Sequence, residues 1–418
     1  MVHKKTGAMA LVAALLLSTS AIAQDKRVVT WNADYDPIPL AAAEALIVDF
    51  EAANPEIDVQ LTNFDHEAYK NAIRNFLTAD APDLANWYAA NRMRPFVEAG
   101  LFADISDVWA NNGLNESLAS SVLSSTIDGK QYAVPYTYYQ WGIYYNRDAY
   151  AAAGVEAPAA DASVDWATFL ANCEKFKAAS IDCVTTGSSA LWPVAGIFDY
   201  LSLRTNGYQF HADLAAGKIS WTSPEARAVF AEFAKLQPFV TENHAAIDWQ
   251  DAAAIFNQGK AANYVMGNFA VGVFKEGGMT NDNLGFMVFP EITAGLARAE
   301  EAPTDTIHLT SGAKNPDDAK LFLAYMANAE AQSKWNAAVG QLPTNKNATV
   351  DAADPFLSAG FVALSTSTGG IAQFWDRDAD AEYAKAGMEG FQRFLVQPEA
   401  LEEILTQLET TRTRLFPQ

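Results

Sequence analysis

The chain has 418 residues, half of them hydrophobic, and its 28 Lys and Arg against 50 Asp and Glu give a formal net charge of −22. This hydrophobic content excludes a disordered chain, and the low Gly and Cys counts exclude collagen-like proteins and disulfide scaffolds. The acidity, without any cluster of Lys or Arg, argues against nucleic acid as a partner, and the length predicts two domains.

The first 23 residues have the features of a secretory signal. Lys4 and Lys5 precede a short apolar run at 8–17, and Ala21 and Ala23 are small residues at the cleavage positions. About ten apolar residues are too few to cross a bilayer, which needs about 20. No Cys lies at the cleavage site for a lipid anchor. We therefore expect an exported, periplasmic protein without membrane insertion, with 1–23 as its signal peptide.

Strands and helices alternate in the next 60 residues. Strands are predicted at 27–31, 57–61 and 83–85, and helices at 40–53 and 67–77. This order predicts an α/β fold with a mainly parallel sheet flanked by helices. Ligands of such sheets bind at the carboxyl ends of the strands, so the loops after the three strands are the first places to search for a site.

An aromatic segment at 134–145 is predicted to run extended from one lobe of the molecule to another. The chain contains no flexible linker, so the two domains must be joined by strands or short segments. Tyr139 lies in the middle of this segment.

The two cysteines are ten positions apart, at Cys173 and Cys183. Cys173 lies on a predicted helix, and Cys183 opens the next predicted strand. Export places both in an oxidising compartment, which favours a disulfide over two buried thiols. Closing so short a loop would stabilise the fold by roughly 2.5–3 kcal/mol on the chain-entropy model.

Helix-start signals are clear later in the chain. Ser223 before Pro224 is typical of an N-cap followed by a first-turn proline, and Asn315 before Pro316 repeats the pattern. Gly340 is expected to end the second of these helical regions. A last helix is predicted at 398–414.

Aromatic residues stand beside carboxylates and amides in the predicted loops. Sugars have apolar faces on which rings stack, and hydroxyls that bind carboxylates, amides and guanidinium groups. A core role is the alternative for each aromatic residue alone. The candidates for a ligand cleft are Asp34, Tyr35, Asp36, Asp65, His66, Asn86, Trp87, Tyr139, Trp192, Trp249, Trp375, Asp376 and Arg377.

Motifs for catalysis or metal binding are absent from the sequence. There is no nucleophile elbow, no phosphate-binding loop and no pair of histidines one helical turn apart. Asp376, Asp378 and Asp380 alternate as in a calcium loop, but Ala381 replaces the turn glycine and Gly387 replaces the bidentate glutamate. We therefore expect no metal and no cofactor.

Several segments in order resemble the periplasmic solute-binding proteins of ABC importers, in the sugar-binding branch that includes maltose-binding protein. Residues 50–59 are similar to the family's first helix running into N-P-x-I-x-V. Residues 77–84 resemble L-x-x-G-x-A-P-D-V, with Asp80 in place of glycine. Further matches are G-K-x-Y-x-x-P at 129–135 with Y-Y-N at 144–146, F-x-x-G-K-A-A at 256–262, Met-Gly at 266–267 and Leu-Pro at 342–343.

The resemblance implies a two-lobed periplasmic-binding-protein fold of type II that closes over its ligand. The N-terminal lobe would comprise 24–136 plus 292–345, and the C-terminal lobe 137–291 plus 346–418. It also implies a monomer that delivers its ligand to ABC transporter permease subunits.

The Met-Gly loop of the family usually continues into an aromatic residue. Here Asn268 follows Gly267, and both are added to the candidate ligand-binding residues.

The aromatic and polar residues of the loops, together with the family resemblance, predict a function. We expect a protein that binds a mono- or short oligosaccharide or a sugar derivative and performs no catalysis. A secreted glycoside-processing enzyme that uses paired acids remains the alternative, because acids are plentiful in the same loops. A polyol, glycerol phosphate or polyamine ligand also stays open, as does the partner of Arg377, which is either an acidic ligand group or a neighbouring aspartate.

Overall fold

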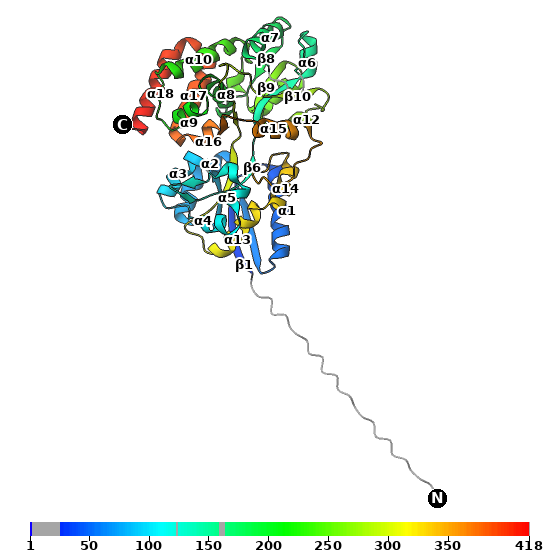
Figure 1. Ribbon diagram of the computed structural model, residues 1–418, viewed down its shortest axis with the longest axis vertical. Helices are drawn as coiled ribbons and strands as arrows, with labels where there is room; N and C mark the ends of the chain where they lie inside the picture. The colour runs from blue at the N-terminus through cyan, green and yellow to red at the C-terminus, as the bar shows by residue number, and fades with distance from the viewer. Residues whose placement is uncertain (2–25, 123, 159–163, 418) are drawn as a thin grey trace.

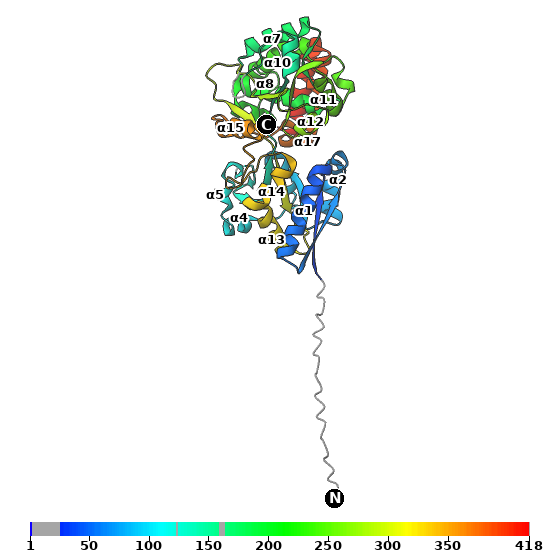
Figure 2. The same ribbon diagram turned by 90° about the vertical axis from the view of Figure 1, so that its right-hand side faces the viewer.

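The computed structural model describes Met1 and residues 26–122, 124–158 and 164–417. The predicted signal peptide otherwise lies outside the described residues. Figure 1 shows two bodies, one above the other, each with a sheet flanked by helices, which confirms the two-lobed α/β fold. The view in Figure 2, turned by 90°, keeps the two bodies separate and shows the connecting segments between them.

The first lobe is built on a five-stranded sheet. Its order is β2 (Ile57–Asn63), β1 (Arg27–Ala33), β3 (Leu84–Tyr88), β12 (Thr304–Leu309) and β6 (Val134–Tyr138). The accompanying elements are α1 (Pro37–Ala53), α2 (His66–Ala79), α3 (Ala90–Glu98), α4 (Ser106–Asn111), α5 (Leu114–Ser117), α13 (Pro316–Ala327), α14 (Ala329–Val339) and the hairpin of β4 (Thr126–Ile127) and β5 (Lys130–Gln131).

The second lobe is built on a four-stranded sheet. Its order is β10 (Leu284–Met287), β7 (Trp141–Asn146), β9 (Ala261–Gly267) and β8 (Asp182–Thr185). Its helices are α6 (Arg147–Ala152), α7 (Trp166–Ala178), α8 (Trp192–Asn206), α9 (Tyr208–Ala215), α10 (Pro224–Leu236), α11 (Trp249–Asn257), α12 (Ala270–Glu276), α15 (Pro355–Ser365), α16 (Trp375–Asp378), α17 (Ala381–Val396) and α18 (Leu401–Leu415). A short parallel pair, β11 (Ala299–Glu301) and β13 (Gly370–Ala372), packs beside α8.

Both sheets are mixed, whereas the sequence predicted mainly parallel ones. β1 runs parallel to β2 and β3, as the β-α-β order requires, but β12 is antiparallel to β3 and β6. The reason is the path of the chain: β6 leaves the first lobe while β12 enters it, so the two strands run in opposite directions. β7 is likewise antiparallel to β9 and β10.

The chain crosses between the lobes where the aromatic segment was predicted. β6 belongs to the first sheet through Tyr138, and β7 begins the second sheet at Trp141. β11 lies against α8 of the second lobe, and the next strand, β12, belongs to the first sheet. The lobe limits given by the sequence stay a prediction, because these strands locate the crossings without fixing the boundary residues.

Local sequence signals explain where several helices begin and end. The Ser223 hydroxyl accepts a hydrogen bond from the Ala226 amide and caps α10, as predicted. Gly340, with a φ of 67°, ends α14. The predicted helical region before Gly340 consists of two helices, because the Asn328 side chain caps α14 after α13 has ended.

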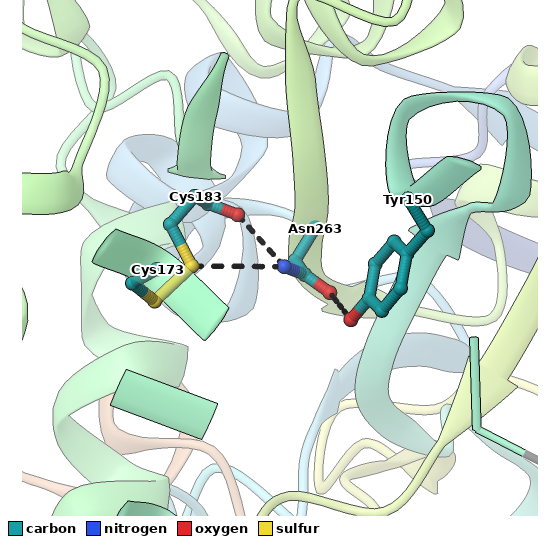
Figure 3. Close-up of a disulfide and its surroundings, with 4 residues drawn as sticks. All are labelled: Tyr150, Cys173, Cys183 and Asn263. Atoms are coloured by element: carbon teal, nitrogen blue, oxygen red, sulfur yellow. Dashed lines mark hydrogen bonds between the residues drawn. A yellow bond between two sulfur atoms is a disulfide. The ribbon is translucent and has the colours of Figure 1, made fainter. Parts of the chain in front are cut away.

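The predicted disulfide joins Cys173 on α7 to Cys183 on β8 and is confirmed (Figure 3). The fully buried side chain of Asn263 on β9 connects it to the rest of the lobe. Its amide donates to the Cys183 carbonyl at 2.9 Å, and its carbonyl accepts from the Tyr150 hydroxyl at 2.8 Å. The disulfide therefore ties α7 to β8, the edge strand of the second sheet.

Candidate functional site

A cavity of about 900 Å³ lies between the two lobes. The first lobe lines it with the loop after β1, the start of α2, the end of β3 and part of β12. The second lobe contributes the starts of α8 and α11, the segment after β9, and α16. The cavity therefore sits at the carboxyl ends of β1 and β3, the position expected for a ligand site in an open sheet.

Most of the predicted site residues meet at this cavity although they are far apart in the sequence. The residues that line it are Asp34, Tyr35, Asp36, His66, Asn86, Trp87, Tyr139, Trp192, Trp249, Asn268, Asp376 and Arg377. The structure brings them together from both lobes; their role in binding remains a prediction.

Three of the predicted residues, Asp65, Gly267 and Trp375, do not line the cavity. The Asp65 carboxylate caps α2 by accepting from the Ala68 amide at 3.0 Å. Gly267 is the last residue of β9, and a Cβ there would stand 2.4 Å from the Phe269 ring, so it serves close packing.

Trp375 is the clearest correction. Its side chain is fully buried, with its ring among Phe198, Trp221 and Phe391 in the core of the second lobe. Its indole N–H donates to the Ala384 carbonyl at 3.2 Å. The residue begins α16 with its side chain on the inner side of the helix, whereas its neighbours Asp376 and Arg377 line the cavity.

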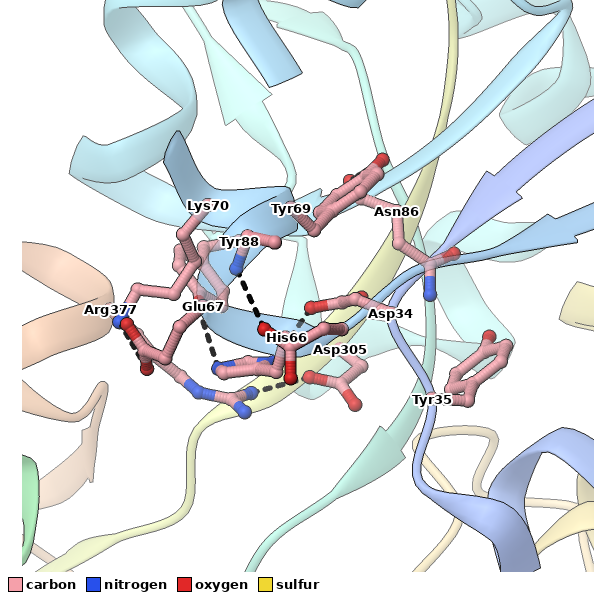
Figure 4. A network of polar contacts seen from close by, with 12 residues as sticks. Asp34, Tyr35, His66, Glu67, Tyr69, Lys70, Asn86, Tyr88, Asp305 and Arg377 are labelled. Carbon is pink, nitrogen blue, oxygen red and sulfur yellow. Dashed lines mark hydrogen bonds and ion pairs between the residues drawn. The ribbon is translucent and has the colours of Figure 1, made fainter. Parts of the chain in front are cut away.

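Charged side chains form a network on the first-lobe side of the cavity (Figure 4). His66 at the start of α2 bonds Asp34, with Nδ1 and Oδ2 2.8 Å apart. Burial lowers the pKa of His66, but the hydrogen bond and the charge of Asp34 raise it more, so the net pKa is above the ordinary value. This pair therefore holds the loop after β1 against α2.

Arg377 forms its ion pair with Asp305 of β12, not with any of its neighbouring aspartates. Its guanidinium also lies 5.0 Å from the Tyr88 ring centre and 4.9 Å from that of Tyr139. The Tyr139 hydroxyl donates to the same Asp305 carboxylate. Asp305 is thus a cavity residue that the sequence did not single out, and it anchors Arg377 from the opposite lobe.

Further polar contacts connect the lobes beside the cavity. Lys70 of α2 lies 2.9 Å from Asp376 of α16. Burial raises the pKa of Asp376, but the charges of Lys70 and Arg92 lower it more, so the net pKa is below the ordinary value. The Asp378 carboxylate accepts from the Asn91 amide at 3.2 Å, and burial raises the pKa of Asp378 to about 6.

Aromatic rings form the second-lobe wall of the cavity. Trp192 and Trp249 stand at the first positions of α8 and α11, with ring centres 6.3 Å apart. Phe269 lies 5.6 Å from Trp249 and 6.1 Å from Trp192. These rings are apolar, whereas charged and amide groups from both lobes line other parts of the cavity, so it offers a stacking surface together with hydrogen-bonding groups.

Trp87 contributes less surface to the cavity than the sequence suggested. Its side chain is 6 % exposed, it packs against Tyr88 at 4.8 Å, and its N–H donates to the Arg92 carbonyl at 3.1 Å. It is mainly a core residue whose edge reaches the cavity.

No group of three or more His, Cys, Asp or Glu side chains in the described part of the chain is placed to hold a metal ion. Among the helices that the structure describes, none combines the length and the hydropathy of a membrane span.

Comparisons with known proteins point to one family. Residues 34–333 match the bacterial extracellular solute-binding proteins. An uncharacterized ABC transporter extracellular-binding protein of Pyrococcus horikoshii is 26 % identical over 78 % of this chain and 73 % of its own length. A multiple sugar-binding protein of Streptococcus mutans is 23 % identical over 71 % of this chain and 70 % of its own.

Among solved structures, the bacterial solute receptor AcbH superposes with a TM-score of 0.84. It is 27 % identical, over 93 % of this chain and 99 % of AcbH, and is described as having an exclusive preference for β-D-galactopyranose. The family match over most of the chain and the two-lobed fold agree: the chain belongs to the bacterial extracellular solute-binding proteins.

Proposed function

We propose that this protein captures a mono- or short oligosaccharide, or a sugar derivative, in the periplasm and delivers it to the permease of an ABC transporter without chemical change. The observation that carries the proposal is the cavity between the lobes, in which aromatic rings of the second lobe occur together with charged hydrogen-bonding groups of both lobes. A sugar has both features on one molecule, because its C–H faces stack on rings while its hydroxyls bind carboxylates and guanidinium groups.

The names of relatives support a carbohydrate ligand. The Streptococcus mutans relative is called a multiple sugar-binding protein, and AcbH is described as a galactopyranose receptor. Relatives named probable sugar-binding periplasmic proteins occur in Brucella melitensis and Rhizobium meliloti, which supports the periplasm as the location. Family membership itself supports binding rather than catalysis.

Closure of the lobes supplies the mechanism. A ligand that contacts both walls at once binds the closed arrangement better than the open one, and it shifts the equilibrium by that difference in affinity. The contacts of α16 with α2 and α3, such as Lys70 with Asp376, would form only when the lobes meet. The permease then recognises the outer surface that the two lobes present together when they are closed.

The test is calorimetric titration of the ligand-stripped protein with neutral hexoses, pentoses and their di- and trisaccharides. We expect saturable binding of a related group of sugars with one site per chain, and recovery of each sugar unchanged after prolonged incubation. Hydrolysis of a bound glycoside would instead establish the glycoside-processing enzyme. Binding of polyols or polyamines in place of every sugar would overturn the carbohydrate assignment while leaving the family intact.

A further inference from the structure

The charges that line the cavity are strongly unbalanced. Lys275 and Arg377 are the two lysine or arginine side chains of the lining, and His66 is the one histidine. Carboxylates outnumber them; these are Asp34, Asp36, Glu67, Asp248, Glu276, Asp305, Asp354 and Asp376. The carboxylates that are buried or partly buried each lie in an ion pair; these are Asp34, Asp305, Asp354 and Asp376. The excess of negative charge therefore resides mainly on exposed carboxylates, which are Asp36, Glu67, Asp248 and Glu276. Because salt screens exposed charges, this excess acts on a ligand most strongly at low ionic strength.

Both cations of the lining already have a carboxylate partner. Arg377 pairs with Asp305, and its guanidinium stands between two tyrosine rings. Lys275 lies 3.8 Å from Asp354, with its ammonium 5.4 Å from the ring centre of Phe356. An anionic ligand would have to displace one of these carboxylates or accept them as close neighbours of like charge.

Two of the lining carboxylates have no partner among the described residues. Asp36 precedes α1 without forming a side-chain hydrogen bond to the helix, and neither it nor Glu276 takes part in an ion pair within the described chain. Both side chains are exposed, and both are acceptors that remain available to a ligand.

Asn268 supplies an independent observation. Its side chain lines the cavity and is only 2 % exposed, and its Oδ1 has no hydrogen-bond partner among the residues that the structure describes. Its Nδ2 donates to the Gly340 carbonyl at 3.4 Å, which leaves the oxygen for another group. A buried carbonyl without a donor costs free energy unless a ligand or a water supplies one.

We propose that the cavity selects its ligand by charge: it accepts a saccharide that carries a protonated amino group, and it rejects saccharides that carry a carboxylate or a phosphate. A protonated amine has only donors, so it can bind the unpaired carboxylates or the buried amide oxygen of the lining. A hexosamine unit also keeps the ring faces that stack on the aromatic wall. This inference rests on the proposed function, because it names the class of sugar that the same cavity takes.

The experiment compares sugars that share a ring and differ in charge. Glucose, protonated glucosamine, N-acetylglucosamine and glucuronate are titrated into the ligand-stripped protein, and the matching galactose series is run in parallel. At about pH 6 the sugar amine is protonated and the carboxylate of the uronate is ionised. We expect the amino sugar to bind at least about tenfold more tightly than the uronate, and its advantage to fall as salt is raised from about 0.05 to 0.5 M.

A charge-removing double variant ties this ratio to the cavity. Asp36→Asn with Glu276→Gln is expected to reduce the ratio of amino-sugar to uronate affinity by about threefold or more. The matched control, Glu174→Gln with Asp282→Asn, removes two exposed acids outside the cavity lining and should leave the ratio unchanged.

Equal affinities for amino sugar and uronate, tighter binding of the uronate, or a ratio that the cavity variant does not change would overturn the charge rule. Those results leave the proposed function standing, because a sugar still binds. Failure of every sugar in both series would count against the proposed function itself, and the charge rule would fall with it.

Discussion

The ion pair between Lys70 and Asp376 offers a direct test of closure. Lys70 projects from α2 of the first lobe, and Asp376 lies on α16 of the second. The two side chains are only 14 % and 10 % exposed where they meet. Lys70→Met keeps the apolar stem and removes the charge, so it abolishes the contact with little loss of packing.

The magnitude follows from the burial of the pair. A hydrogen-bonded ion pair that is largely shielded from water is worth about 1–2 kcal/mol, more than an exposed surface pair. If the contact forms only in the closed arrangement, the ratio of closed to open protein falls by about 5- to 30-fold. Ligand affinity falls with it by up to the same factor, because the ligand binds the closed form.

The assay is calorimetric titration of the tightest sugar into the wild type, Lys70→Met, Asp376→Asn and the double variant. We expect each single variant to weaken binding and the double variant to lose less than the sum, because the two residues act through one contact. Lys235→Met is the matched control, because Lys235 pairs with Glu232 within α10, outside the cavity lining. Unchanged affinity in Lys70→Met, together with a lower free energy of unfolding of the ligand-free protein, would refute this account: the contact would then be a fixed part of the fold.

Three further predictions concern single side chains. Trp375→Ala should lower the free energy of unfolding by about 3–5 kcal/mol in urea denaturation, because it empties a fully buried site, and a loss below about 1 kcal/mol would contradict the core placement. Trp249→Ala should weaken sugar binding by about tenfold or more, because its ring faces the cavity, and it should lower the free energy of unfolding less than Trp375→Ala does. Unchanged sugar affinity would show that Trp249 does not stack on the sugar. The pair of His66 with Asp34 should stabilise the protein fully below about pH 6.5 and progressively less as the pH rises through the raised pKa of His66, so the melting-temperature difference between wild type and His66→Asn should shrink from about pH 5.5 to 8.5. A difference that does not depend on pH would show that the pair is not charged in the folded protein.

Local patterns were enough to predict which loops line the cavity between the lobes. The β-α-β order fixes parallel strands, so residues at their carboxyl ends gather at one edge of the sheet. Asp34 and His66 follow β1 and β2, Asn86 lies within β3, and all three line the cavity. The aromatic segment between the lobes and the disulfide were also accessible, because each depends on residues near one another in the sequence.

Long-range pairing was not accessible from the sequence. Asp305 lies on a strand that returns from the other lobe, so nothing near Arg377 in the chain marks it as the partner. The available signal was an aspartate within the segment Thr304–Leu309, whose β-branched and apolar residues favour a strand, and this strand is largely buried.

Burial of single aromatic residues also escaped prediction. Trp375 and Arg377 are two positions apart on a single turn of helix, so they point to different sides, and the tertiary packing of α16 on α8 and α17 decides which side faces the cavity. Trp87 shows the same effect on a strand whose residues are all buried. For both residues, substitution by alanine is therefore expected to lower the free energy of unfolding more than it lowers ligand affinity.

Small-angle X-ray scattering of the ligand-stripped protein, with and without a saturating sugar identified by calorimetry, tests whether the lobes close on the ligand. A sugar held between two closing lobes should reduce the radius of gyration, and Lys70→Met should need more sugar to reach the same compact state. A saturating sugar that leaves the radius of gyration unchanged in wild type and variant alike would contradict capture by closure of the lobes.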